Sequence, residues 1–488
     1  MDDNNKSLKS KVISSMFWKF CERIGARLVT FVISLILARL LTPDDYGVVA
    51  LITVFIALLD TVVTSGFGSS LIQRKDADEL DFSSVFYFCV LLSCGLYLLL
   101  FFAAPWIALF YRNDKLTFLV RVMGLRLLFS GVSTVQNAYV DRNMMFKRYF
   151  FSSTFSAIIS GVVASGMALS GFGVWSLVAQ NLIYSISSIL ILWFTVRWRP
   201  VLRFSMRRMR ELYSYGWKLL VSSIITTLYN EIRELVIGRL YSTADLGYYT
   251  RGRSFPGLIN DNLTATINSV LFPAIAQKQR NRETVKIMTR RSMKTTAYLV
   301  MPVMTGLAVV ARPLVLLLLT EKWSECIIYL QIACFTSAFT PLQSANLQAI
   351  KALGYSGTIL KLDIIKRSAG LFVLFLVMRY GVIAIAPSTI WNAIMFTLIN
   401  MHPNKKLLNY SINEQLMDIA PFIGMCAIMA ALVYPIQFLQ LPLSVVLAMQ
   451  TATGIVLYIA MSVVFKVDSY SYIRDIAMSY IMPGKYKI

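Results

Sequence analysis

Charged side chains inside long apolar runs are the residues of this sequence that could do chemistry. Lys19, Arg23 and Arg27 recur at intervals of four residues in the first apolar run, so on a helix they would lie along one face. Glu22 is close enough to pair with Lys19, which leaves a net positive stripe. The stripe suits a di- or polyphosphate, although pairing with acids of other helices, or a lysine that reaches the interface, would explain the same residues.

Acidic residues in other apolar runs are candidates for binding or exchanging an ion. Asp60 and Asp261 lie near the centres of two such runs, where loss of water favours the neutral carboxyl and so permits proton exchange near neutral pH. Glu231 and Glu234 share a helix face in a third run, where an ion-coupling role and a structural ion pair with arginines are both open. The sequence thus predicts no organic cofactor, with H⁺ or Na⁺ as candidate coupling ions.

Further cations and amides could line a cavity together with these charges. Arg126 and Arg367 lie within apolar runs, where a charge is costly unless it faces a cavity or a partner. Three amides, Gln331, Gln343 and Asn346, could hydrogen-bond sugar hydroxyls, although amides also join neighbouring transmembrane helices.

Several kinds of site are missing from the sequence. One histidine, His402, cannot build a multi-histidine metal site and makes a serine-histidine triad improbable. No G-x-x-x-x-G-K-[ST] segment occurs, and the six cysteines show no paired metal-ligand spacing. The connections on one side are too short for the large catalytic loops of a polysaccharide polymerase. We therefore expect no metal and no enzymatic activity.

The elements that carry these residues are apolar runs of transmembrane length. The 488 residues are 57% hydrophobic and 15% charged, and each run is long enough to cross about 30 Å of hydrocarbon. We expect an all-α integral membrane fold of about fourteen helices. Their approximate ranges are 13–40, 45–72, 82–110, 116–140, 150–170, 173–196, 213–240, 246–276, 292–319, 325–350, 358–379, 381–401, 416–436 and 441–465.

Basic residues are distributed unevenly among the connections between these runs. One alternate set of connections, with both termini, holds 27 Lys and Arg, and the other set holds 4. Because cytoplasmic loops are enriched in Lys and Arg, both termini are predicted to be cytoplasmic and the helix count to be even. The same rule accounts for the net charge of +22 without nucleic acid as a partner.

An internal repeat divides the expected helices into two lobes. Residues 38–47 read ARLLTPDDYG and residues 238–247 read GRLYSTADLG, a match at a spacing of 200. Since six helices separate the two copies, the copies have the same orientation in the membrane, as parallel repeats do. We expect one lobe at 1–200, a second at 201–401, and two further helices with an amphipathic cytoplasmic tail at 402–488.

Several longer segments resemble a known family. They are WKFCERIGARLVTFVISLILARLLTPDDYGVVAL, QNAYVDRNMMFKRY, FPGLINDNLTATINSVLFPAIAQKQRN and MPVMTGLAVVARPLVLLLLTEKW. Together they resemble the Wzx-type polysaccharide and lipid-linked oligosaccharide flippases, a branch of the multidrug/oligosaccharidyl-lipid/polysaccharide exporter superfamily. The resemblance covers nearly the whole chain, and its motifs are specific for the family and not for the glycan.

The resemblance implies a transport function in the bacterial cytoplasmic (inner) membrane. It implies that an undecaprenyl-pyrophosphate-linked oligosaccharide moves from the inner to the outer leaflet by alternating access between two lobes. Such a step serves the synthesis of O-antigen, capsule or exopolysaccharide, with the polymerase and glycosyltransferases of the same pathway as further partners. Two other functions stay open: a drug/cation antiporter of the same fold, and a polysaccharide polymerase.

Overall fold

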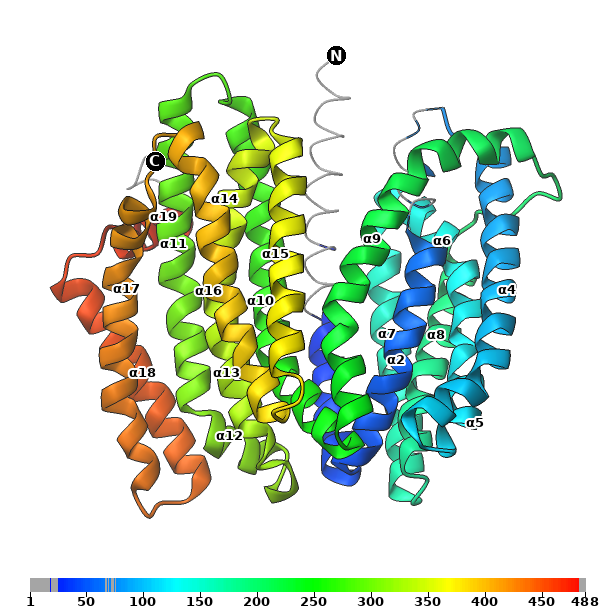
Figure 1. The fold of residues 1–488 in the computed structure, drawn as a ribbon, viewed down its shortest axis with the longest axis horizontal. Coiled ribbons are helices and arrows are strands. Elements are labelled where there is room, and N and C mark those ends of the chain that lie inside the picture. Colours follow the sequence, from blue (N-terminus) through cyan, green and yellow to red (C-terminus); the bar gives the residue numbers. More distant parts are fainter. Residues whose placement is uncertain are drawn as a thin grey trace. The chain divides into compact units, whose positions relative to one another are not determined.

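The computed structural model describes Trp18 and residues 25–481 apart from 66, 67, 69, 72, 73 and 75. Within these residues the secondary structure is helical and includes no strand. The chain forms two compact units, Met1–Gly247 and Tyr248–Ile488, and each is a bundle of long helices (Figure 1). The predicted all-α fold is confirmed.

The first unit begins with a helical segment at residues 25–40. Its further helices are α2 (Pro43–Thr64), α4 (Glu79–Tyr111), α5 (Lys115–Gly124), α6 (Arg126–Arg142), α7 (Phe146–Leu169), α8 (Val174–Thr195) and α9 (Met206–Leu240).

The second unit begins within the helix that follows α9, at Tyr248, and continues to Ile488. Its helices are α10 (Thr243–Gln277), α11 (Arg282–Val309), α12 (Ala311–Leu318), η1 (Glu321–Trp323), α13 (Cys326–Ala338), α14 (Thr340–Ala352), α15 (Ser356–Val377), α16 (Val382–Leu407), α17 (Ile412–Val433), η2 (Tyr434–Phe438), α18 (Leu443–Val464) and α19 (Asp468–Ile481).

Many of these helices are long and apolar enough to cross a membrane. Within the described residues nine helices meet both conditions, and a tenth span is α11 with α12, which are bent by 63° at their junction. Three further long helices, α9, α10 and α15, coincide with expected spans and are not among these ten. The chain is a multi-pass membrane protein, and the total of fourteen spans stays a prediction.

Local sequence fixes where several helices begin. The side chain of Thr42 accepts a hydrogen bond from the Asp45 amide, and the Asp45 carboxylate accepts from the Thr42 amide, which is a complete capping box before α2. Ser242 and Asp245 make the same pair of hydrogen bonds at the start of α10. The two matched decapeptides therefore have matching local structure, although duplication of whole lobes stays a prediction.

Two glycines of the matched decapeptides allow α2 and the first turn of α10 to touch. A side chain at Gly47 would place its Cβ 1.7 Å from the carbonyl oxygen of Thr243. In return, a Cβ at Gly247 would lie 2.0 Å from the carbonyl oxygen of Pro43. Because real Cβ atoms do not approach backbone so closely, neither position tolerates a side chain without movement of one helix.

Each unit has its own apolar core. In the first unit Phe82, Phe86 and Trp198 pack with tilted and edge-on rings where α4 begins and α8 ends. In the second unit Tyr298 of α11 packs against Phe422 of α17 and Tyr458 of α18. These two clusters fix the ends of the helices that carry the polar residues described next.

Candidate functional site

A polar cluster lies within the spanning helices of the first unit. Ser130 of α6 donates a hydrogen bond to Oδ1 of Asp60 in α2. One turn earlier on α6, Nη1 of Arg126 lies 3.5 Å from Oδ1 of Asn181 in α8. A carboxylate, a guanidinium, an amide and a hydroxyl from three helices are therefore neighbours.

The guanidinium of Arg126 keeps most of its hydrogen-bonding capacity. Its contact with Asn181 is at the outer limit of a hydrogen bond, and it pairs with no acid among the side chains that the structure describes. An arginine has five N–H donors in a planar fork that suits phosphate oxygens. The cluster therefore offers an anion the donors of Arg126, with the half-buried carboxylate of Asp60 on the neighbouring helix. An ion-coupling role for Asp60 stays a prediction.

The predicted first-helix stripe is described in part. Arg27 is exposed on the segment 25–40. This segment packs closely on α7, since Ile33 occupies the space that a Cβ at Gly161 would need. Lys19 and Arg23 lie outside the described residues. Their alignment with Arg27 along one face stays a prediction.

The predicted ion-coupling acids of α9 and α10 are described to different extents. Glu231 and Glu234 are half-buried on α9, on either side of Arg233, whose side chain is buried and lies 5.6 Å from the ring of Tyr229. The side chain of Asp261 is outside the described part of the chain. A coupling role for these acids stays a prediction.

The three predicted sugar-binding amides make hydrogen bonds to backbone in the second unit. Gln331 donates to the Ala308 carbonyl at 3.2 Å and Gln343 to the Ala393 carbonyl at 3.1 Å. Asn346 is fully buried, with its amide nitrogen 2.9 Å from the Leu342 carbonyl.

The bonds of Gln331 and Gln343 match the helix-joining role that amides commonly have in membrane proteins, whereas that of Asn346 lies within its own helix. Gln343 and Asn346 belong to α14, and the bond of Gln343 reaches α16. Arg367 is half-buried in α15, next to Lys366, whose Nζ pairs with Oδ1 of Asp363 at 2.8 Å. Contact of the amides and of Arg367 with a substrate stays a prediction.

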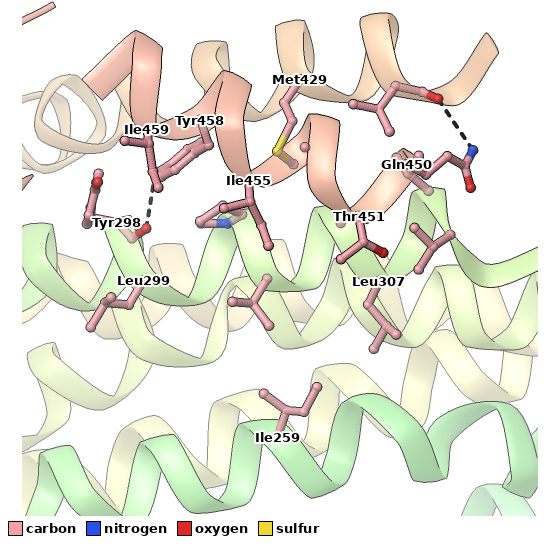
Figure 2. Close-up of a pocket in the computed structure, with 17 residues that line it drawn as sticks. Ile259, Tyr298, Leu299, Leu307, Met429, Gln450, Thr451, Ile455, Tyr458 and Ile459 are labelled. Carbon is pink, nitrogen blue, oxygen red and sulfur yellow. Dashed lines mark hydrogen bonds between the residues drawn. The ribbon is translucent and has the colours of Figure 1, made fainter. Parts of the chain in front are cut away.

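Sequence reasoning did not find an apolar cavity in the second unit. The cavity has a volume of about 570 Å³ and lies between α11, α17 and α18, with Ile259 of α10 on one side (Figure 2). Leu299, Leu307 and Ile455 point into it, and Gln450 is turned toward the Val433 carbonyl, to which it donates. Each wall was predicted as a helix, but no sequence pattern indicates that three apolar faces leave a space.

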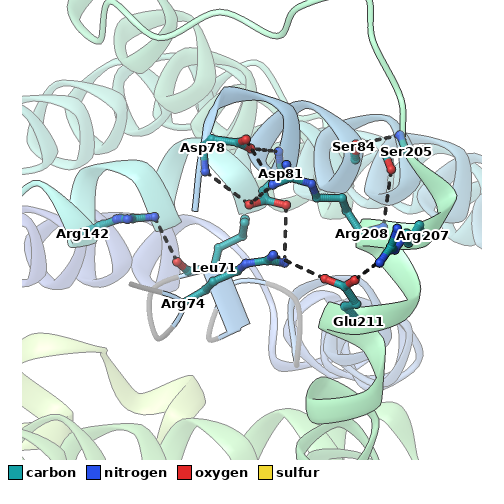
Figure 3. A network of polar contacts seen from close by, with 10 residues as sticks. All are labelled: Leu71, Arg74, Asp78, Asp81, Ser84, Arg142, Ser205, Arg207, Arg208 and Glu211. Carbon is teal, nitrogen blue, oxygen red and sulfur yellow. Dashed lines mark hydrogen bonds and ion pairs between the residues drawn. The ribbon is translucent and has the colours of Figure 1, made fainter. Parts of the chain in front are cut away.

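Sequence reasoning also missed an ion-pair network at one end of the first unit. Asp81 is fully buried at the start of α4, and its carboxylate contacts Nη1 of Arg208 at 3.2 Å and Nη1 of Arg74 at 3.5 Å (Figure 3). Asp78, the N-cap of α4, pairs with the same Arg208 at 3.1 Å. The Asp78-x-x-Asp81 spacing is a capping-box signal in the sequence. No sequence pattern indicates the partner Arg208, which lies 127 residues from Asp81.

The network fastens the segment before α9 to α4. The Ser83 and Ser84 hydroxyls accept hydrogen bonds from the backbone amides of Val201 and Ser205 at 2.9 and 3.0 Å. The backbone N–H of Asp81 and the nearby Arg208 hold the pKa of Asp78 below its ordinary value, so the carboxylate is charged at neutral pH. The start of α9 is thereby held by charge as well as by hydrogen bonds.

Spanning helices that hold a polar cluster and an apolar cavity define a membrane transport protein. Residues 36–328 match the family described as polysaccharide biosynthesis protein. This match covers more than half of the chain, so the chain belongs to that family, in the Wzx-type branch of the exporter superfamily that the sequence resembles.

Relatives and solved structures agree with this assignment. The succinoglycan biosynthesis transport protein ExoT of Rhizobium meliloti is 27% identical over 64% of this chain, and the match spans 63% of that protein's length. The teichuronic acid biosynthesis protein TuaB of Bacillus subtilis is 23% identical over 71% of this chain and 72% of its own. The lipopolysaccharide biosynthesis protein WzxC of Escherichia coli is 25% identical over 67% of both chains.

Among solved structures, the lipid II flippase MurJ in an inward closed conformation has a TM-score of 0.75 at 15% identity, over 93% of this chain and 99% of that one. An inward-facing multidrug resistance MATE transporter has a TM-score of 0.63 at 16% identity, over 81% of this chain and 99% of that one. The fold is therefore shared with both kinds of carrier. ExoT is named a transport protein, which agrees with a transport role and with the expected lack of enzymatic activity.

Proposed function

We propose that the protein flips an undecaprenyl-pyrophosphate-linked oligosaccharide from the cytoplasmic to the outer leaflet of a bacterial inner membrane. The step supplies lipid-linked units for a surface polysaccharide, whose glycosyltransferases and polymerase act before and after it. Its substrate is amphiphilic, with a long apolar chain, two phosphates and several sugars. A carrier for it needs an apolar and a polar binding region within one chain.

The apolar cavity is the observation that carries this proposal. Its volume of about 570 Å³ is within the range of ligand pockets, and its lining is almost entirely aliphatic or aromatic. A cationic drug would find no acid in that lining, whereas a polyprenyl chain would bury its surface there. The cavity therefore favours a lipid-linked substrate over a soluble cation.

The polar cluster of the first unit supplies the complementary part. Arg126 retains donors for a phosphate oxygen, and Asn181 beside it can bind a hydroxyl or the same phosphate. The relatives' names concern biosynthesis of succinoglycan, teichuronic acid and lipopolysaccharide, which are saccharide polymers. A pyrophosphate-linked oligosaccharide fits both the cations and the pathways of those relatives.

Asp60 is the acid we propose for coupling transport to a proton or Na⁺ gradient. Its carboxylate accepts a hydrogen bond from Ser130, one helical turn from Arg126. Protonation would remove a negative charge near that arginine and strengthen its hold on an anion. Binding of substrate and binding of the ion would thus depend on each other.

The test fills the apolar cavity without creating a clash. Gly306 lines the cavity, and a Cβ there would meet nothing within 4 Å, so the ring of Gly306→Phe should occupy space that the lipid chain needs. We expect reconstituted vesicles with this variant to flip a fluorescent polyprenyl-pyrophosphate oligosaccharide at least about tenfold more slowly than wild type, which is about 1.4 kcal/mol in activation free energy.

A matched control separates this effect from a general effect of the larger side chain. Gly95 of α4 also faces open space, so Gly95→Phe should flip substrate at the wild-type rate. Equal rates for Gly306→Phe and wild type would remove the cavity from the proposal. Extrusion of a cationic dye by vesicles that do not move the lipid-linked glycan would instead establish a drug antiporter.

A further inference from the structure

A second cavity lies in the second unit between α17 and the end of α18. Its volume is about 460 Å³. Phe422 and Met425 of α17, which are 2% and 3% exposed, form its buried apolar part, and the exposed Ile428 extends this part outward. The lining also carries four charged residues: Asp418 is buried, Lys294 is half-buried, and Lys466 and Asp468 are exposed.

The two acids of this lining are poor partners for its lysines. The carboxylate of Asp418 is already bound by Nη2 of Arg290 at 2.6 Å and by the Tyr410 hydroxyl, which donates to it at 2.7 Å. Asp468 has a side chain that is 92% exposed, and a pair of that kind contributes little in water. Neither acid therefore neutralises the cavity.

The two lysines remain available to an anion. Nζ of Lys294 is 3.9 Å from Asp468 and 4.0 Å from Asp418, both at the outer limit for an ion pair. Lys466 is exposed just after the end of α18 and pairs with no acid among the residues that the structure describes. The lining thus combines two cations with an apolar interior.

The position of the cavity along the spans places it at a membrane surface. Both α17 and α18 are apolar enough to cross a membrane, and the cavity extends along α17 from Asp418 to Ile428 and past the last turn of α18, where Lys466 and Asp468 lie. The next helix, α19, is held to α11 by Arg291, whose guanidinium lies 3.7 Å from the ring of Tyr472. By the distribution of basic residues this end faces the cytoplasm.

We propose that this cavity binds an anionic phospholipid of the inner leaflet, with the phosphate between Lys294 and Lys466 and one acyl chain along Phe422, Met425 and Ile428. The site is distinct from the transport substrate's cavity, which lies along α11 and α18 and shares with it none of these residues. Anionic headgroups are attracted by each basic residue at such a surface, and the apolar interior selects a lipid over a soluble phosphate.

The experiment measures lipid retained by the full-length protein in detergent. Dioleoylphosphatidylglycerol and dioleoylphosphatidylcholine are titrated separately, and the bound fraction is read by native mass spectrometry. Wild type should retain the anionic lipid at lower concentration than the zwitterionic one. The double variant Lys294→Gln with Lys466→Gln should bind phosphatidylglycerol roughly tenfold or more weakly, with phosphatidylcholine unchanged.

Two exposed lysines at the same end of the second unit provide the control for charge. Lys405 and Lys406 lie in the last turn of α16, outside the cavity, so Lys405→Gln with Lys406→Gln should leave phosphatidylglycerol binding at the wild-type level. If the two double variants lose the lipid equally, general surface charge explains the binding, and the proposal is wrong.

A further variant tests the apolar part of the site. Gly424 lines the cavity, and a side chain there would meet nothing within 4 Å, so Gly424→Leu should fill the cavity and weaken phosphatidylglycerol binding without loss of folding. A Cβ at Gly95 would also meet nothing within 4 Å, and Gly95→Leu should leave phosphatidylglycerol binding unchanged. Competition by millimolar inorganic phosphate, or undiminished binding by Gly424→Leu, would overturn the lipid site in favour of an anion site.

Discussion

Arg126 and Arg121 show how two arginines of one span differ in chemical availability. Arg121 donates from Nε to the Phe101 carbonyl at 3.2 Å and lies 4.2 Å from that ring, so its environment is complete. Arg126 has a single long contact with an amide. Both were visible in the sequence as charges within an apolar run, and the sequence could not separate them because the partners lie on other helices.

This difference predicts different consequences of the same substitution. We expect Arg126→Gln to slow the flipping of a polyprenyl-pyrophosphate glycan at least about tenfold, because one charge-assisted hydrogen bond is worth about 1.5–3 kcal/mol. Arg126→Lys should restore part of the rate. Arg121→Gln is the control and should flip normally; if Arg121→Gln is as slow as Arg126→Gln, Arg126 has no special contact with the anion.

Among the elements, α9 depends on a residue that no local pattern connects to it. Its first turn is held by the buried Asp81 of α4 through Arg208. We expect Asp81→Asn to lower the stability of the purified protein by about 2 kcal/mol, because two arginines lose a charged acceptor. Since Glu211, paired with Arg74, is half-exposed, Glu211→Gln should cost less than about 0.5 kcal/mol.

Thermal unfolding in detergent measures both variants of this network. Asp81→Asn should melt a few degrees below wild type, whereas Glu211→Gln should melt at the wild-type temperature. Identical melting of Asp81→Asn and wild type would show that the hydrogen bonds of Ser83 and Ser84 hold α9 by themselves.

Helix boundaries were predictable where the signal is local. The spans expected at 150–170 and 173–196 correspond to α7 and α8, whose borders differ from those ranges by a few residues. The 63° bend between α11 and α12 was not predicted, since the apolar run continues on both sides of it. Gly47 and Gly247 appeared as a repeat match, and the structure adds the reason, a backbone contact at each glycine.

At the scale of the whole molecule, hydropathy and charge predicted the fold class but not its cavities. An apolar run reveals a span because the membrane demands about 20 apolar residues in succession. A cavity depends on which side chains of several helices fail to fill a space, and that information is spread over residues 259–459. The polar cluster is predictable in part, because its charged residues can be found in the sequence but their partners on other helices cannot.

Orientation in the membrane is the whole-molecule property that the sequence predicts most directly. The unequal distribution of Lys and Arg, 27 against 4, places the connection with Lys405 in the cytoplasm and the connection with Lys322 outside. In a cysteine-free background, Lys322→Cys should react with a membrane-impermeant maleimide in intact cells, whereas Lys405→Cys should react after the inner membrane is permeabilised. The reverse pattern would invert the molecule, and would place the proposed phospholipid site in the outer leaflet. Labelling of both cysteines in intact cells would mean that an even number of spans, and not the expected three, separates Lys322 from Lys405, so the expected spans between them would be wrong.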